Sequence, residues 1–177
     1  SLAALSGFGK KSAENILKGL EELKQNLGKV RINVATQVGE RLLGFLAELP
    51  EVERASPVGR LRCGSEEFDR ISLLAATSDP KRVIAAITAT ELLDACTEID
   101  DGVEGTSPEL LKVMIHLCTP ELYPVRLHRL TGAHDHCFMV GIPLADRGYV
   151  IGDDGLFRDG APVHVESEEE LYALAGM

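Results

Sequence analysis

The spacing of apolar residues predicts helices in the first third of the chain. From residue 13 to residue 23 apolar side chains recur at helical intervals, and a second helical pattern covers residues 33–49. Pro50 ends this second pattern, because proline lacks the amide donor that a helix interior needs. The side of the second helix that we expect to face the core carries Val34, Val38, Leu42, Phe45, Leu46 and Leu49.

The middle of the chain has shorter apolar runs that predict strands and one further helix. The helix covers residues 78–91, with Pro80 at its first helical position. An acidic loop is expected over residues 100–107. The expected strands are residues 52–63, 71–76, 92–99 and 110–119, of which the first two meet at a polar hairpin.

Side chains alternate between the two faces of a strand, which allows neighbours to be assigned from the sequence. Arg70 and Ser72 therefore share one face of their strand, and Met114, His116 and Cys118 share one face of theirs. We expect His116 to be packed or hydrogen-bonded, and Met114 to fill space in the core.

Length and composition indicate the size and the class of the protein. The 177 residues are enough for one sizeable domain, or for a domain with small flanking subdomains. The apolar fraction of 45% and the charged fraction of 26% are typical of a soluble globular protein. No apolar run approaches the roughly 20 residues of a membrane span, and no secretory signal opens the chain. The chain starts on Ser1 without an initiator methionine, so we expect it to be a piece of a longer protein.

The four cysteines are widely spaced, so the sequence predicts neither a zinc site nor a disulfide framework. We expect reduced thiols in the cytoplasm. The cysteines are Cys63, Cys96, Cys118 and Cys137.

Charge is unevenly distributed along the chain. The net charge is −10, which opposes binding to nucleic acid because phosphate contacts need lysine and arginine. Residues 1–31, however, hold six basic and three acidic residues, so a basic end precedes an acidic body.

The basic end contains the sequence Gly7-Phe8-Gly9-Lys10-Lys11. Two glycines around one apolar residue allow a tight hairpin between helices, and the free amides at the start of the second helix attract a phosphate without reading bases. Together with the lysine pair and the family resemblance described below, this pattern predicts a helix-hairpin-helix that binds DNA. A plain helix-helix turn is the alternative.

The stretch GRLRCGSEEFDRISLLAAT, residues 59–77, resembles the family X DNA polymerases, the relatives of DNA polymerase beta. Bacterial members carry Gly-Ser-x-Arg-Arg-Gly, then Glu-Thr-x-Gly, then Asp-x-Asp-Leu-Leu. The positions that keep this pattern are Gly59, Leu61, Arg62, Gly64, Glu66, Ile71, Leu73 and Leu74.

A second motif continues the resemblance. Thr131, Gly132 and His136 match the family's Tyr-Phe-Thr-Gly-Ser-x-x-His, in which the Tyr-Phe pair becomes Arg129-Leu130. The asparagine that follows in the family becomes Cys137, and a family arginine that helps to hold the DNA minor groove aligns with Gly141. Residues 147–148, 155–157 and 167–174 also fit the end of the family's polymerase core.

The resemblance implies an α+β fold, a DNA polymerase beta-like nucleotidyltransferase palm with flanking subdomains. Residues 1–50 would form the helix-hairpin-helix (fingers-like) region and the helix that enters the palm. Residues 51–120 would form the palm, and residues 121–177 a thumb-like subdomain. By resemblance the hairpin is also expected to hold Na⁺ or K⁺ on the carbonyls of Ala3, Leu5 and Phe8.

The family's catalytic residues are replaced at the matching positions. Its three metal-binding aspartates fall on Arg70, Ser72 and Met114, so ligands for Mg²⁺ or Mn²⁺ are missing. Its two phosphate-binding residues fall on Arg60 and Cys63. The positions that match the family's nucleotide site are Gly59, Arg60, Arg62, Cys63, Arg129, Leu130, Thr131 and Gly132.

Other polar clusters are expected to be structural. Asp69 is adjacent to the replaced aspartates, but a shift of one residue directs it to the opposite face of its strand. The pairs at 100–101 and 153–154 are expected to be solvated turn residues, and residues 134–137 a loop in which His136 holds the turn rather than a metal cluster.

Arg70 has two possible roles. Its guanidinium could bind a DNA phosphate in place of the metals, or it could pair with Glu66 or Glu67 and hold the strands together.

The main hypothesis is a DNA-binding polymerase domain of a DNA repair protein, in which nucleotidyl transfer is lost or strongly reduced. It would bind gapped DNA or a duplex with a primer end, without sequence preference, next to companion domains of a longer cytoplasmic, nucleoid-associated bacterial protein. An active but divergent DNA polymerase, with relocated carboxylates or Mn²⁺, is the alternative. A third possibility, favoured by the acidic body, is a protein-interaction domain.

Overall fold

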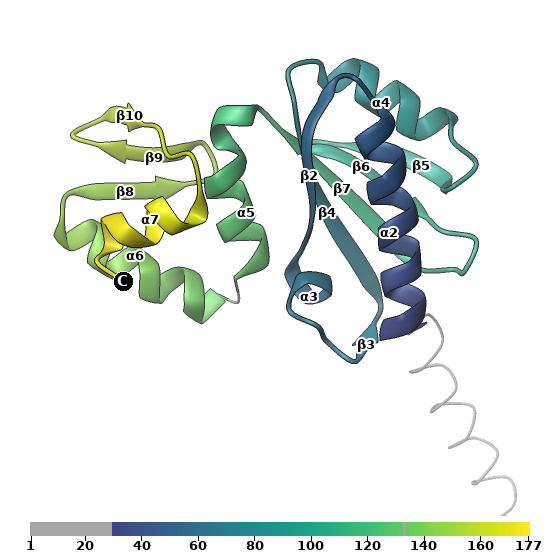
Figure 1. The fold of residues 1–177 in the computed structure, drawn as a ribbon, viewed down its shortest axis with the longest axis horizontal. Helices are drawn as coiled ribbons and strands as arrows, with labels where there is room; N and C mark the ends of the chain where they lie inside the picture. Colours follow the sequence, from purple (N-terminus) through teal and green to yellow (C-terminus); the bar gives the residue numbers. More distant parts are fainter. Residues whose placement is uncertain (1–29, 133) are drawn as a thin grey trace, which may run out of the picture.

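The computed structural model describes residues 30–132 and 134–177. Figure 1 shows a larger unit, built on a five-stranded sheet, beside a smaller unit that contains a three-stranded sheet, with helix α5 (Tyr123–Thr131) between them. The predicted helix-hairpin-helix around Gly7 and Lys10 and the expected cation ligands Ala3, Leu5 and Phe8 lie outside the described residues.

Helix α2 (Ile32–Glu48) confirms the prediction for residues 33–49. Ala35, Val38, Leu42 and Leu46 recur at intervals of three or four residues and are fully buried, which places them on one face of the helix. The helix ends two residues before Pro50.

The larger sheet is mixed, as expected for an α+β fold. Its order is β2-β4-β7-β6-β5, in which β4 and β7 run parallel and the other neighbours run antiparallel. The pairing of β4 with β7 confirms the expectation that residues 71–76 and 113–119 belong to one sheet. The strands are β2 (Val52–Val58), β4 (Arg70–Thr77), β5 (Asp94–Ile99), β6 (Gly102–Thr106) and β7 (Lys112–Cys118).

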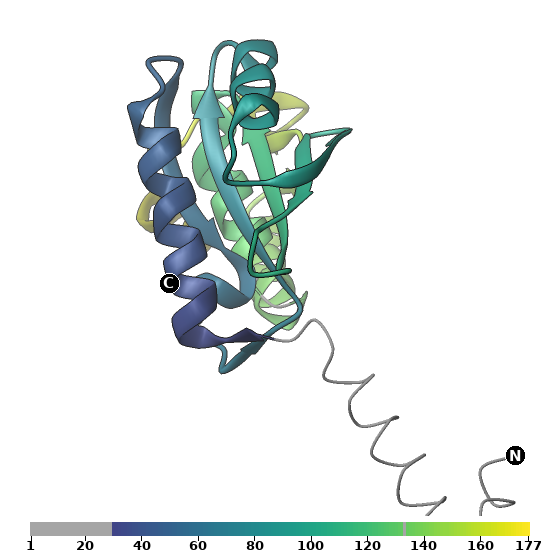
Figure 2. The ribbon, with the colours of Figure 1, turned by 90° about the vertical axis from the view of Figure 1, so that its right-hand side faces the viewer.

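Two helices cover one face of this sheet. Helix α4 (Pro80–Ala89) begins at Asp79, whose carboxylate accepts a hydrogen bond from the Arg82 amide. Together with α2 it packs on alternate residues of β4 and β7, and Figure 2 shows both helices on the same side of the sheet. The buried residues of this layer include Leu42, Leu46, Ile71, Leu73, Val83, Ile87, Val113 and Ile115.

The opposite face of the sheet is covered by α5. Val58, Leu74 and Ala76 pack there against Tyr123, whose hydroxyl donates a hydrogen bond of 2.7 Å to Ser56 Oγ. These contacts lie toward the carboxyl end of β4. The start of β4 and β7 on this face carries Arg70, Ser72, Lys112 and Met114, which are exposed or partly exposed.

Two segments differ from the sequence-based expectation. Residues 59–62, expected to be part of a strand, form the short helix α3 (Gly59–Arg62), because Gly59 has φ +57° and turns the chain out of β2. The expected acidic loop over residues 100–107 is mostly strand β6, which is held between β5 and β7 by ladder hydrogen bonds. The hairpin itself contains a further short strand, β3 (Glu67–Phe68), which pairs with β1 (Val30–Arg31).

The smaller unit has its own core, formed by Val140, Leu144, Leu156 and Leu171 with neighbouring apolar residues. Residues 134–137, expected to be a loop, begin helix α6 instead, so His136 lies in a helix. The elements after β7 are the 3₁₀ turn η2 (Pro120–Leu122), α5, α6 (His134–Asp146), β8 (Tyr149–Gly152), β9 (Gly155–Arg158), β10 (Ala161–Val163) and α7 (Glu168–Ala175).

In the part of the chain that the structure describes, no helix combines the length and apolar character needed to cross a membrane.

Candidate functional site

Strands β4 and β7 bring together Arg70, Ser72 and Met114, the three positions that the sequence resemblance led us to expect in place of the family aspartates. Their parallel register sets Ser72 beside Met114, and the Arg70 guanidinium lies 4.0 Å from the Met114 sulfur. The site therefore presents a guanidinium, a hydroxyl and a thioether. These groups do not fit Mg²⁺, which prefers oxygen ligands and carboxylates in particular.

Arg70 does not form either of the ion pairs expected from the sequence. Across residues 30–132 and 134–177, its hydrogen-bond partner is the sulfur of Met114, and it takes part in no salt bridge with a described residue. The neighbouring Asp69 accepts a hydrogen bond of 3.3 Å from Arg60. Asp69 is thus engaged by another arginine.

Four of the residues expected at a nucleotide site gather in a cavity of about 490 Å³ between α3, α5 and α7. They are Arg62, Cys63, Thr131 and Gly132. Arg62 donates hydrogen bonds to Thr131 Oγ1 at 3.3 Å and to Glu168 Oε2 at 2.7 Å. The bond to Glu168 raises the pKa of Arg62, so this guanidinium stays charged but is already paired.

The other positions of the expected nucleotide site do not line this cavity. They are Gly59, Arg60, Arg129 and Leu130. Gly59 lies against the end of α5, where a Cβ atom would come 3.4 Å from the Leu130 carbonyl oxygen. Arg60 instead donates to the Glu67 carbonyl at 2.6 Å and lies over the Phe68 ring, and Arg129 binds Asp153. Arg60 and Arg129 therefore do not line the cavity.

Three residues on the cavity wall, His128, Tyr172 and Glu168, were assigned no role in the site from the sequence. His128 is 1% exposed, and its ring lies next to His136 and to Tyr172, whose hydroxyl is 3.3 Å from His128 Nδ1 and 3.4 Å from His136 Nε2. Burial, reinforced by the nearby His136, lowers the pKa of His128. Glu168, the third of these residues, stands 106 positions from Arg62 in the sequence, a separation that local motifs cannot bridge.

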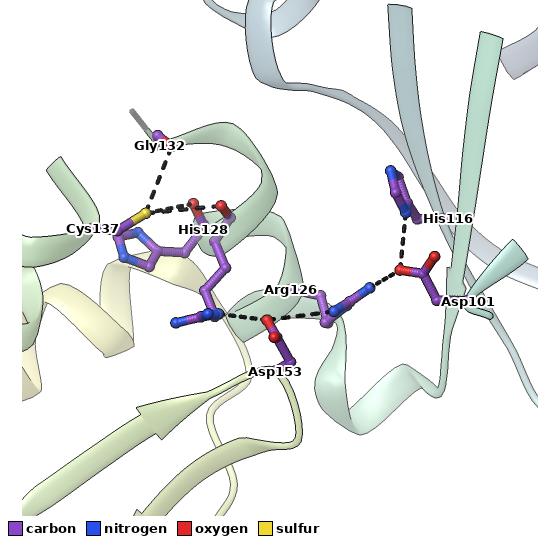
Figure 3. A network of polar contacts seen from close by, with 8 residues as sticks. Asp101, His116, Arg126, His128, Gly132, Cys137 and Asp153 are labelled. Carbon is purple, nitrogen blue, oxygen red and sulfur yellow. Dashed lines mark hydrogen bonds and ion pairs between the residues drawn. The ribbon is translucent and has the colours of Figure 1, made fainter. Parts of the chain in front are cut away.

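A network of ion pairs links the two units, and Figure 3 shows it in detail. Asp101, in the turn between β5 and β6, accepts from Arg126 and lies 2.9 Å from His116 Nδ1. Arg126 also lies 3.6 Å from Asp153, which accepts a hydrogen bond of 2.8 Å from Arg129 Nε.

Asp101 and Asp153 lie in turns, as expected, with 37% and 66% of their side chains exposed, and each is also bound by arginine. Burial alone would raise the pKa of Asp101, but the hydrogen bond and charge of His116 and the charge of Arg126 lower it. The expectation of a partnered His116 is confirmed.

The Cys137 side chain packs beside the carboxyl end of α5. Its sulfur lies 3.6 Å from the Gly132 carbonyl oxygen and 3.9 Å from that of His128, as Figure 3 shows, and burial raises the pKa of the thiol. Within the described residues, His, Cys, Asp and Glu side chains nowhere gather in threes in a way that suits a metal ion.

Comparison with known proteins gives one similar protein, while no family model matches the chain. The chain is 29% identical over 180 aligned residues to the DNA polymerase/3'-5' exonuclease PolX of Bacillus subtilis (strain 168). The alignment covers 98% of this chain and 31% of that protein, so the chain spans about a third of its relative's length. This identity supports a relationship to the family X polymerases.

Proposed function

We propose that the chain is the polymerase domain of a family X-like DNA repair protein that binds DNA without reading its sequence and has lost, or strongly reduced, nucleotidyl transfer. The observation that carries this proposal is the composition of the site on β4 and β7. Its three side chains are those of Arg70, Ser72 and Met114, in a chain that aligns with PolX along almost its whole length.

The chemistry of nucleotidyl transfer supports the loss of activity. Two divalent ions must be held about 3.5–4 Å apart by clustered carboxylates. A guanidinium stays protonated at any working pH, so Arg70 repels a divalent ion where the reaction needs ligands. Arg62, which keeps an arginine of the family motif, is paired with Glu168 and so is not free to take a triphosphate.

Relocated carboxylates, which an active enzyme would need, are less well supported. Asp101 and Asp153, one from each acidic pair considered in the sequence, are both bound by arginine. Asp69 is bound to Arg60. A carboxylate that already holds a guanidinium has no free charge with which to gather two metal ions.

The proposed domain boundaries follow the division of the structure into a larger and a smaller unit. Residues 51–120 would form the palm and residues 121–177 the thumb-like subdomain. The separate main cores of the larger and the smaller unit support that division, while a third cluster packs Tyr123 against the larger sheet. Helix α2 packs on the larger sheet, which supports its role as the helix that enters the palm. DNA binding would place the protein in the bacterial cytoplasm, at the nucleoid.

A primer-extension assay tests the loss of activity. The 177-residue chain is incubated with a gapped template, deoxynucleotides and either Mg²⁺ or Mn²⁺, and we expect no extension above background. Extension that survives Arg70→Ala and disappears in Asp101→Asn or Asp153→Asn would establish the divergent polymerase instead.

DNA binding is measured separately, by titration at several salt concentrations. We expect Lys10→Glu together with Lys11→Glu to weaken binding to all sequences alike, because lysines that neutralise phosphates act by counterion release. An exchange of Lys81 for Glu, on α4, is the matched control. An unaltered chain that fails to bind DNA would favour the protein-interaction domain.

A further inference from the structure

The face of the larger sheet that carries Arg70 is open at one end. Helices α2 and α4 cover the other face, and α5 covers this one only around Leu74 and Ala76. The first residues of β4 and β7 are thus accessible, and they include two cations whose positions are fixed by the strands rather than by a loop.

The register of the two parallel strands sets Arg70 directly beside Lys112. Residues paired in this way project from the same face of a sheet, so the two basic side chains leave the sheet from adjacent positions. Both residues are exposed, and the Lys112 side chain is 67% accessible. Arg70 itself touches only the uncharged Met114 among the hydrogen-bond partners that the described residues provide.

One carboxylate lies near this pair. Glu104, on the adjacent strand β6, is 4.0 Å from the Lys112 ammonium, and both side chains are substantially exposed. An exposed ion pair at this distance contributes at most about 1 kcal/mol, so an incoming anion can replace Glu104 as the partner of Lys112.

We propose that Arg70 and Lys112 together bind one backbone phosphate of DNA directly, at the place where the related polymerases are expected to hold metal ions. Guanidinium and ammonium groups are the usual partners of phosphate oxygens, and two of them on one rigid sheet face need little reorganisation to bind. The inference rests on the proposed DNA-binding function. It specifies which residues bind the DNA and which group they bind, an internal phosphodiester that is held without a metal.

The salt dependence of DNA binding tests this inference. Binding of the 177-residue chain to a gapped duplex is titrated from 50 to 200 mM salt, with EDTA present, for the unaltered protein and for the double variant Arg70→Ala, Lys112→Ala. Loss of one phosphate contact lowers the slope of log affinity against log salt by about 0.9, so the fold-loss of affinity over this range shrinks by about 3.5-fold.

Two further variants make the result specific. Lys81→Ala removes an exposed cation from α4, on the covered side of the sheet, and should leave the slope unchanged. Glu104→Gln removes the competing carboxylate and should strengthen binding in the unaltered background, but not in the double variant.

The outcomes separate the two proposals. Salt-dependent binding that the double variant and Glu104→Gln leave unchanged would overturn the phosphate site and retain DNA binding. Absence of binding by the unaltered chain would overturn both. Circular dichroism of each variant checks that these surface changes leave the fold intact.

Discussion

At the scale of single residues, the hydrogen-bond partners and the burial of an arginine or histidine depend on its neighbours in space. Strand alternation was sufficient to predict that Arg70 and Ser72 share a face of β4 and that Met114 and His116 share a face of β7, because the period of a strand is fixed. It could not predict that Arg60 binds Asp69 or that His128 is buried, since those outcomes depend on the short helix α3 and on the packing of α7.

The buried His128 gives a prediction for pH. Its pKa lies below the ordinary value of 6.5, so the unfolded chain takes up the proton first as the pH falls. The free energy of unfolding should therefore decrease below pH 6.5, with a slope of up to about 1.4 kcal/mol per pH unit from this group. His128→Gln, which keeps a polar side chain without titrating, should remove that part of the slope in urea unfolding between pH 7.5 and 5.

The groups that face His128 have to be considered in the same experiment. They are His136 on α6, Glu168 and Tyr172 on α7, and Arg129 on its own helix. The exposed His164 provides the control, because His164→Gln changes a histidine outside this cluster. A slope that is equal in His128→Gln and the unaltered protein would show that the buried histidine does not titrate differently on folding.

At the scale of secondary structure, long helices were easier to predict than short or paired elements. The apolar spacing from 33 to 49 predicted α2 almost to the residue. Strand β6 lacked a local signal: it contains two glycines, and its identity comes from its place between β5 and β7. A strand that forms because neighbouring strands pair with it cannot be predicted from local periodicity alone.

Gly102, the first residue of β6, shows how closely those partners approach. It has φ +156°, and a Cβ atom there would lie 1.9 Å from the Ile115 carbonyl oxygen. Gly102→Ala should therefore destabilise the protein by about 2–4 kcal/mol, because the backbone of β7 must move. Gly44→Ala is the control: this residue lies in α2 with open space around it, and the exchange should stabilise the helix by about 0.5–1 kcal/mol.

Urea unfolding of both glycine variants measures these effects. Opposite signs are expected for the two exchanges. A change of less than about 0.5 kcal/mol in Gly102→Ala, the size of an ordinary surface substitution, would mean that β6 and β7 are not packed as described.

At the scale of the whole molecule, the two units are joined by apolar packing of α5 on the larger sheet and by charged contacts around that helix. Arg62 reaches from α3 to Glu168 on α7, and Arg126 bridges Asp101 in the larger unit and Asp153 in the smaller one. From the sequence we predicted only that Asp101 and Asp153 lie in turns. The pattern did not indicate which arginines bind them, because these arginines are not close neighbours in the sequence. Such contacts follow from the arrangement of the units, which local patterns do not specify.

Arg126 is the member of this network whose loss should separate the units most. Its side chain is 12% exposed, and it contacts a carboxylate on each side. Arg126→Gln leaves Asp101 partly buried without its charge partner, which should cost about 1–3 kcal/mol. Arg82→Gln removes an exposed ion pair to Glu51, with the arginine side chain 72% accessible, and should cost less than about 1 kcal/mol.

Calorimetry distinguishes a local loss from a loss of coupling between the units. If Arg126 couples them, unfolding of the unaltered chain occurs in one transition, and Arg126→Gln broadens or divides it as the smaller unit melts first. Arg82→Gln should retain the single transition, since its ion pair lies within the larger unit. A single transition of unchanged width in Arg126→Gln, shifted no more than in Arg82→Gln, would show that apolar packing around Tyr123 and α5 holds the units together without the ion pairs.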